Sequence, residues 1–311
     1  MASDARSAVP TVRSRQPNKG LWVGLGLPGI VWLLFLFVAP MYVVMAILFG
    51  QIDPVLRRPV PVWNPIEWNT IQFRFVLSHI FGEEGYFGPA LVRTGVYVLT
   101  ASVLCVFIAY PVAYYVARYA GRRKGLILIL LIAPFWISYM MRMLAWVNLL
   151  QNDGLVNQFL GGIAGDDAAV EWLSGHSFTV ILGLVYGYVP YMILPLFAGL
   201  DRIPQAQIEA ARDLGASRFE TFRRVTLRLS LPAIVVSVLL TCLPMLGDYF
   251  TADLLSGTPG TSMIGNLING SVLTPGQTGQ AAAFVLIVML VSLIPMAAYV
   301  WVSRDREAVA S

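Results

Sequence analysis

Long apolar intervals separated by short polar segments dominate this sequence. Each interval exceeds the roughly 20 residues that a helix needs to cross a lipid bilayer, and each holds few charged residues. We therefore expect about six transmembrane helices, at residues 21–49, 94–117, 125–150, 177–200, 230–254 and 281–303.

The composition supports the same fold class, an all-α membrane protein. Hydrophobic residues make up 57% of the chain and charged residues 12%, with a mean hydropathy of +0.70. A soluble domain carries about 25% charged residues, so this chain cannot cover a globular surface with charge. The composition therefore predicts that the outer surface of the protein contacts membrane lipid. The first interval is too long for the apolar core of a signal peptide, about 7–15 residues, and we expect it to remain as an uncleaved span.

The distribution of Lys and Arg predicts the orientation in the membrane. Segment 151–176 has no Lys or Arg, and segment 257–280 has no charge. Positive residues near span ends favour the cytoplasm, so both termini should be cytoplasmic. The basic residues do not form one stripe, and we expect no nucleic-acid partner. The basic segments are the N-terminal tail 1–20, the loop 118–124, the segment 201–229 and the C-terminal tail 304–311.

The predicted cytoplasmic segment 201–229 has the pattern of a folded element. Its apolar spacing predicts two short helices that meet near Gly215, where glycine can adopt a positive φ and end the first helix. Ser217 is suited to cap the second helix. Ala210, Ala211, Gly215 and Ala216 form a surface of small residues that permits close approach of another backbone. From these residues alone, an ordinary amphipathic surface segment remains an alternative.

The same segment resembles the EAA loop of ABC importer permeases. The match consists of Glu209-Ala210-Ala211, Gly215, Val225 and Leu227, and it departs at Arg228, where proline is usual. The resemblance covers roughly 20–303 and is nearest to the polyamine (spermidine/putrescine) branch of binding-protein-dependent permeases. Further matching residues are Pro134-Phe135-Trp136 with Arg142, Asn152 to Asn157, Tyr188 to Met192, Gly247-Asp248-Tyr249 and Met263 to Asn266.

This resemblance implies a type I ABC importer permease fold in the bacterial cytoplasmic membrane. It implies an ABC ATPase dimer, a second homologous permease subunit and an extracytoplasmic solute-binding protein as partners. The EAA loop would be the coupling helix that enters a cleft on the ATPase. The residues that the resemblance assigns to ATPase coupling are Glu209, Ala210, Ala211, Asp213, Leu214, Gly215 and Ala216.

The chain lacks the motifs of an ATPase or another enzyme. It has no Gly-x-x-x-x-Gly-Lys-Ser/Thr phosphate loop, so ATP and Mg should bind the partner ATPase, and we expect no cofactor, metal or catalytic residue on this chain. His79 and His176 have no ligand spacing nearby. Iron or a phosphonate is an alternative substrate, and a secondary transporter or channel is an alternative function.

Charged residues within the expected spans include Arg142 and Asp248. A charge near the middle of a span costs about 2.5–3.5 kcal/mol on insertion scales, so Arg142 and Asp248 need an explanation. The sequence leaves three alternatives open: an Arg142–Asp248 pair, an Asp248 that attracts a cationic solute, or an Arg142 that snorkels to the outer interface.

Aromatic residues near these charges supply a candidate polyamine pathway, because aromatic faces attract alkylammonium groups. An interfacial aromatic belt is the alternative. The candidate pathway residues are Asp248, Tyr249, Trp136, Tyr139, Arg142, Tyr188 and Tyr191.

Overall fold

The computed structural model describes residues 19–53, 55, 59–82, 85, 87–165 and 170–310, without the side chains of 19–23, 52, 164, 298 and 301–310. Within these residues the regular secondary structure is helical apart from one antiparallel hairpin. In the hairpin, Gln51 of β1 (Gln51–Ile52) pairs with Val60 of β2 (Pro59–Val60). The predicted all-α class is confirmed. The helices are α1 (Lys19–Leu48), α2 (Ile71–Phe81), α3 (Gly88–Tyr119), α4 (Lys124–Ile132), α5 (Tyr139–Leu150), α6 (Leu155–Ala164), α7 (Ser177–Asp201), α8 (Gln205–Asp213), α9 (Arg218–Thr221), α10 (Leu227–Leu246), α11 (Phe250–Leu255), α12 (Ile264–Leu273) and α13 (Thr278–Ala310).

Five helical stretches in the described part of the chain are long and apolar enough to cross a membrane, and a bent pair makes up to six. The expected number of spans is therefore confirmed. The stretches are Gly24–Leu48, Gly88–Tyr119, Ser177–Asp201, Arg218–Leu246 and Thr278–Ala297, with Gly121–Trp136 and Tyr139–Ile163 as the bent pair.

The third expected span, 125–150, is not one straight helix. The stretch that ends at Trp136 and the stretch that begins at Tyr139 meet at an angle of 83°. Pro134 lies in a 3₁₀ turn at the end of the first stretch, and Ile137 is extended, with ψ 134°. Proline removes a backbone donor and so weakens helix continuity at this point. Arg142 therefore lies after the bend, in the first turn of α5.

The fifth expected span, 230–254, also breaks. Helix α10 ends at Leu246, Gly247 is its C-cap, and a separate short helix, α11, begins at Phe250. Asp248 therefore lies in a gap between two helices. Backbone that is not helical is tolerated at membrane depth where protein buries it or where it lines a cavity.

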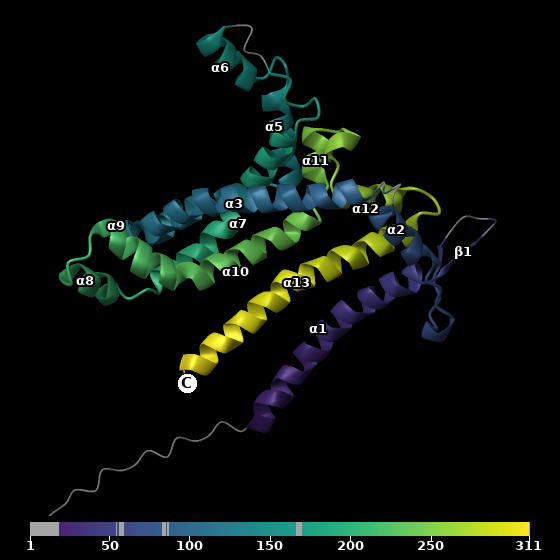
Figure 1. Cartoon of the computed structure of the whole chain (residues 1–311), viewed down its shortest axis with the longest axis horizontal. Helices are drawn as coiled ribbons and strands as arrows, with labels where there is room; N and C mark the ends of the chain where they lie inside the picture. The colour runs from purple at the N-terminus through teal and green to yellow at the C-terminus, as the bar shows by residue number, and fades with distance from the viewer. Residues whose placement is uncertain are drawn as a thin grey trace, which may run out of the picture.

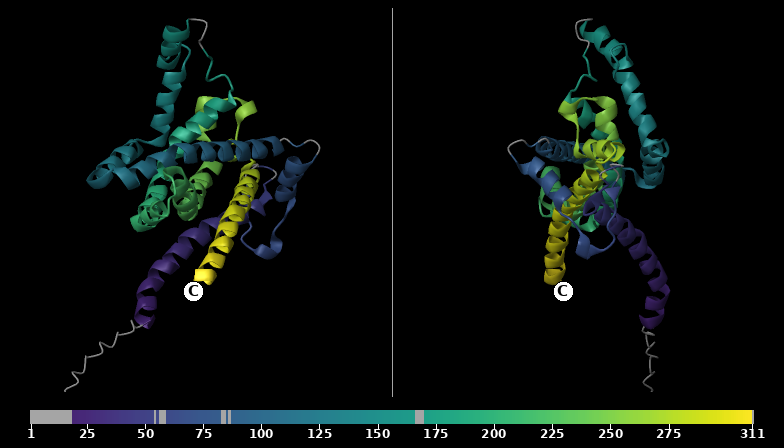
Figure 2. Two further views of the ribbon diagram at one scale, coloured as in Figure 1. Left: turned by 60° about the vertical axis from the view of Figure 1, so that its left-hand side comes forward. Right: turned by 90° about the vertical axis from the view of Figure 1, so that its right-hand side faces the viewer.

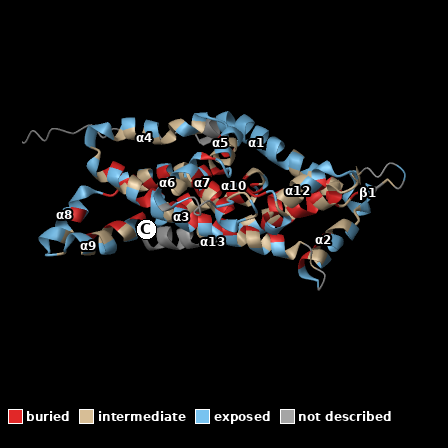
Figure 3. Cartoon of the chain, turned by 90° about the horizontal axis from the view of Figure 1, so that it is seen from above, coloured by how far each residue is buried: buried red, intermediate tan, exposed pale blue. Residues whose placement is uncertain are grey.

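The core lies where α7 packs between α3 and α10, and buried residues concentrate along these helices (Figure 3). Glycines on α7 allow close approach. A Cβ at Gly187 would lie 2.6 Å from Cε2 of Tyr139, and one at Gly199 would lie 2.1 Å from Cβ of Ala233. Any larger side chain at these positions would push the neighbouring helix away.

The molecule has two distinct ends (Figure 1). Helices α8 and α9 lie toward one end, as do the start of α1 and the finish of α13, while α2, α12 and the hairpin lie toward the other. The arm formed by α5 and α6 projects away from the other helices (Figure 2). Helix α1 packs against α13, and most of its described side chains are exposed, as expected for a surface that lipid or another subunit covers.

Candidate functional site: a cytoplasmic loop and a junction of broken helices

The segment between α7 and α10 folds into the predicted pair of short helices. Gly215 has φ 87°, and its N–H donates to the Arg212 carbonyl at 2.9 Å. The Ser217 hydroxyl accepts from the Glu220 N–H at 3.2 Å, and the Glu220 carboxylate accepts from the Ser217 N–H at 3.2 Å. This reciprocal capping box starts α9. The predicted turn at Gly215 and cap at Ser217 are confirmed.

The loop presents apolar side chains to solvent. Leu214 is 89% exposed and Phe219 is 69% exposed, while Ile208 packs inward and is 6% exposed. Of the residues assigned to coupling, Glu209, Ala210, Asp213, Leu214 and Gly215 are exposed, and Ala211 and Ala216 are half-buried. Large exposed apolar side chains beside small residues are typical of a surface that a partner covers. Their role in ATPase coupling stays a prediction.

Two basic residues at the corner between α3 and α4 contact the end of α7, where this segment begins. Arg118, in the last turn of α3, donates to the Leu200 carbonyl at 3.0 Å and to the Ile203 carbonyl at 3.1 Å. Lys124 forms an ion pair with Asp201. A guanidinium on the final carbonyls of a helix satisfies groups that have no intrahelical partner and complements the helix dipole. The end of α7 is therefore tied to the α3–α4 corner where the coupling segment begins.

The helix after the loop runs unbroken past Arg228, from Arg218 to Leu246. The departure from the EAA pattern at Arg228 therefore brings no helix break. A π-helical turn, Phe222–Thr226, joins α9 to α10. Phe222 makes edge contacts with Tyr110 and Tyr114 of α3, at ring-centroid distances of 5.9 and 5.6 Å.

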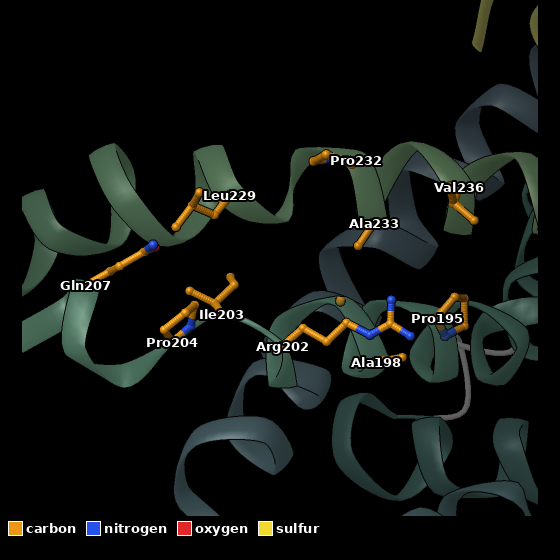
Figure 4. Close-up of a pocket in the computed structure, with 11 residues that line it drawn as sticks. Pro195, Ala198, Arg202, Ile203, Pro204, Gln207, Leu229, Pro232, Ala233 and Val236 are labelled. Atoms are coloured by element: carbon orange, nitrogen blue, oxygen red, sulfur yellow. The ribbon is translucent and has the colours of Figure 1, made fainter. Parts of the chain in front are cut away.

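A groove of about 500 Å³ lies between the end of α7 and the start of α10 (Figure 4). The Arg202 side chain extends along it toward Pro195 (Figure 4). No acidic side chain lines the groove, so it offers no counter-charge to a cation. The lining residues are Pro195, Ala198, Gly199, Arg202, Ile203, Pro204, Gln207, Leu229, Pro232, Ala233 and Val236.

The two broken spans meet at Asp248, whose carboxylate is fully engaged by neighbouring donors. The Tyr139 hydroxyl donates to Oδ2 at 2.6 Å, and the Thr251 hydroxyl donates to the same oxygen at 2.7 Å. The Thr251 N–H donates to Oδ1 at 3.1 Å. Asp248 is 6% exposed. Thr251 was not anticipated from the sequence, although a hydroxyl three residues after an acidic residue at a helix start is a usual capping partner.

Arg142 lies beside this junction and does not pair with Asp248. Its guanidinium carbon is 4.9 Å from the Phe135 ring centroid and 5.4 Å from that of Tyr139. It is 6% exposed, and its Nε has no hydrogen-bond partner. Within the described chain no ion pair reaches it. Of the three alternatives that the sequence leaves open, the pair and the snorkelling arginine are therefore wrong for this conformation.

Four aromatic rings contact one another in sequence beside this junction, and two candidate pathway residues take no part in these contacts. Tyr188 is 5.7 Å from Tyr139 and 6.0 Å from Tyr191 between ring centroids, and Phe135 meets Tyr191 edge-on at 4.4 Å. Trp136, by contrast, is 82% exposed. Tyr249 stacks on Phe250 at 4.1 Å. The structure thus brings Tyr139, Arg142, Tyr188, Tyr191 and Asp248 together.

These features define a class: a helical membrane protein with charged residues at helix breaks and a folded loop between two spans that exposes apolar side chains. A family model places the chain more narrowly. The model for the binding-protein-dependent transport system inner membrane component matches residues 21–307. The chain belongs to this family and is a multi-pass inner-membrane protein.

Curated relatives are similar over much of the sequence. The spermidine/putrescine transport system permease protein PotB of Haemophilus influenzae is 31% identical over 85% of this chain and 88% of its own length. PotB of Escherichia coli strain K12 is 35% identical over 55% of this chain. The chain spans about three fifths of the length of this relative and of similar ones, 61% for the E. coli protein.

Among solved structures, a chain of a bacterial alginate ABC transporter in complex with a periplasmic protein bound to alginate pentasaccharide has a similar fold. It is 21% identical, with a TM-score of 0.68 over 92% of this chain and 94% of that chain. At this identity the likeness supports the fold alone, which is that of an ABC importer permease.

Proposed function

We propose that this chain is a permease subunit of an ATP-driven importer for polyamines such as spermidine and putrescine. In this proposal it forms half of the translocation pathway and has no catalytic role. ATP and Mg bind a separate ABC ATPase dimer. A second homologous permease completes the pathway, and an extracytoplasmic solute-binding protein delivers the substrate.

The observation that carries the proposal is the exposed surface at the α8–α9 turn. Leu214 and Phe219 are exposed on a segment whose backbone is ordered by Gly215 and by the Ser217–Glu220 capping box. A rigid turn with apolar side chains is suited to fill a cleft on a partner, because little ordering entropy is lost on binding. The family membership makes an ATPase the partner that we infer.

Two observations favour polyamines over an anionic solute. PotB proteins with spermidine/putrescine in their names are among the similar relatives, and an acidic residue, Asp248, lies among aromatic rings at the helix breaks. A carboxylate with aromatic faces attracts alkylammonium groups and disfavours a phosphonate. Two broken helices that meet at one point are also a usual place for a transport site.

Uptake into proteoliposomes that contain the complete transporter tests the function. We expect spermidine uptake to require both ATP and the solute-binding protein. Asp248→Asn should lower uptake without lowering assembly with the ATPase, whereas Glu209→Lys or Gly215→Trp should abolish ATPase binding with membrane insertion intact. Asp153→Lys, the same class of change on an exposed residue between α5 and α6, is the control. Uptake that proceeds without ATP would instead support a secondary transporter.

A further inference from the structure

The aromatic residues around Arg142 have the arrangement of a binding site for an organic cation. We name as the aromatic cage the four rings of Phe135, Tyr139, Tyr188 and Tyr191. They come from the 3₁₀ turn before the 83° bend, from α5 and from α7. A cation within about 6 Å of an aromatic centroid is attracted by the ring face, and Asp248 provides a negative charge bonded to Tyr139.

The cage already holds a cation, and that cation belongs to the chain itself. The Arg142 guanidinium lies over two of the four rings, at 4.9 and 5.4 Å from their centroids. No hydrogen bond to its Nε and no ion pair stabilises it among the residues that the structure describes. Its contacts are therefore those that an alkylammonium group would make in the same place.

Structural stability does not account for a cation here. A buried charged side chain is costly unless it is paired or faces water, and Arg142 is 6% exposed without an ionic partner among the described residues. Asp248 forms no ion pair with it, and its carboxylate instead accepts hydrogen bonds from Tyr139 and Thr251. A charged residue whose burial costs free energy and that has no ionic partner in the described chain is better explained by a role in another step of the transport cycle.

We propose that Arg142 is a tethered occupant of an alkylammonium site formed by the aromatic cage, and that a substrate ammonium takes its place during transport. The proposal rests on the proposed function, since it names the subsite that a polyamine would use. Phe135 and Arg142 lie on opposite sides of the 83° bend, so a change in the bend withdraws the guanidinium from that ring. Asp248 then compensates the charge of whichever cation is present.

Direct binding to the assembled transporter, with both permeases and the ATPase in nanodiscs and without the solute-binding protein, tests this. The probes are radiolabelled putrescine and butylammonium, a single alkylammonium group. Arg142→Met keeps the apolar stem and removes the charge, which empties the cage, and Arg142→Lys keeps a tethered cation. We expect Arg142→Met to bind both probes about 2- to 30-fold more tightly than wild type, the range that one cation–π contact allows.

The controls separate the cage from general effects on the protein. Arg142→Lys should bind like wild type, and adding Asp248→Asn to Arg142→Met should remove the gain. Equal probe affinity in wild type and Arg142→Met would overturn the proposal. If Arg142→Met does not assemble, Arg142→Gln takes its place; failure of both to assemble would also overturn it, because Arg142 would then be a structural contact. Polyamine uptake by wild-type proteoliposomes is measured in parallel, and its absence would contradict the proposed function, since butylammonium binding does not depend on the identity of the cargo.

Discussion

Replacing Arg118 with methionine removes two hydrogen bonds that hold the end of α7 where the coupling segment begins. Methionine keeps most of the apolar stem, so the change acts mainly on the guanidinium. The bonds lost are those to the Leu200 carbonyl at 3.0 Å and to the Ile203 carbonyl at 3.1 Å. Pro204 caps α8 directly afterwards. Fixing these two carbonyls therefore fixes the orientation of α8 relative to α7.

The size of the effect follows from the strength of those bonds. A hydrogen bond with a charged donor contributes about 1.5–3 kcal/mol. Arg118 is half-buried, so water can partly replace the lost donors. We therefore take the free energy lost with both hydrogen bonds to be near the lower limit of this range for a single bond. A loss of about 1.4 kcal/mol in the competent orientation of α8 weakens ATPase binding about tenfold.

The assay measures the dissociation constant between the purified ATPase and the permease complex, and the ratio of ATP hydrolysed to polyamine imported. We expect Arg118→Met to raise the dissociation constant about tenfold and to raise the ratio. Arg118→Lys should recover part of the effect. Arg122→Met is the matched control, since Arg122 is exposed in the same corner and no described residue bonds to it. Equal values for Arg118→Met and Arg122→Met would refute the reasoning.

Three further changes have expected outcomes. Gly187→Ala forces Tyr139 away from Asp248 at a cost of about 1–3 kcal/mol and should lower polyamine uptake several-fold with assembly intact, whereas Gly95→Ala, with nothing within 4 Å of its added Cβ, should match wild type. Leu214→Asp should weaken ATPase binding at least about tenfold, since burial of a leucine contributes about 1.5–3 kcal/mol. Val55→Asp, which replaces an exposed residue between β1 and β2, should leave ATPase binding unchanged. Ser217→Ala should cost about 1 kcal/mol of α9 stability, measured as faster hydrogen exchange at the Glu220 amide.

The sequence predicted the helical spans and the coupling turn because both depend on local physics. Burial in lipid selects long apolar runs whatever the tertiary contacts are, and a positive φ at Gly215 follows from residue type. The capping box also lies within four consecutive residues, from Ser217 to Glu220.

The breaks in the third and fifth spans were not predicted, because polar residues within an apolar run do not show whether the helix continues through them. Ile137 and Tyr249 are as compatible with a span as their neighbours are, and proline occurs inside unbroken α3, at Pro111, as well as beside the bend, at Pro134. Arg142 stacks on rings whose positions depend on that bend. The pairing of Tyr139 with Asp248, 109 residues apart, likewise requires the packed structure.

One element connects the two functional regions. The helical stretch Arg218–Leu246 starts at the coupling turn and ends directly before Gly247 and Asp248; its 29 residues correspond to a length of about 44 Å at 1.5 Å per residue. Such a helix transmits displacement as a rod between its irregular points, which are the π-helical turn Phe222–Thr226 and the two prolines inside α10, Pro232 and Pro244. Phe222 packs on α3 at the π-helical turn, so a shift of the coupling turn that changes this contact also moves α10. The far end of the rod carries the residues that hold Tyr139 beside the Arg142 guanidinium. Under the proposed function, a displacement of the α8–α9 turn is transmitted toward the aromatic cage through this one continuous helical stretch.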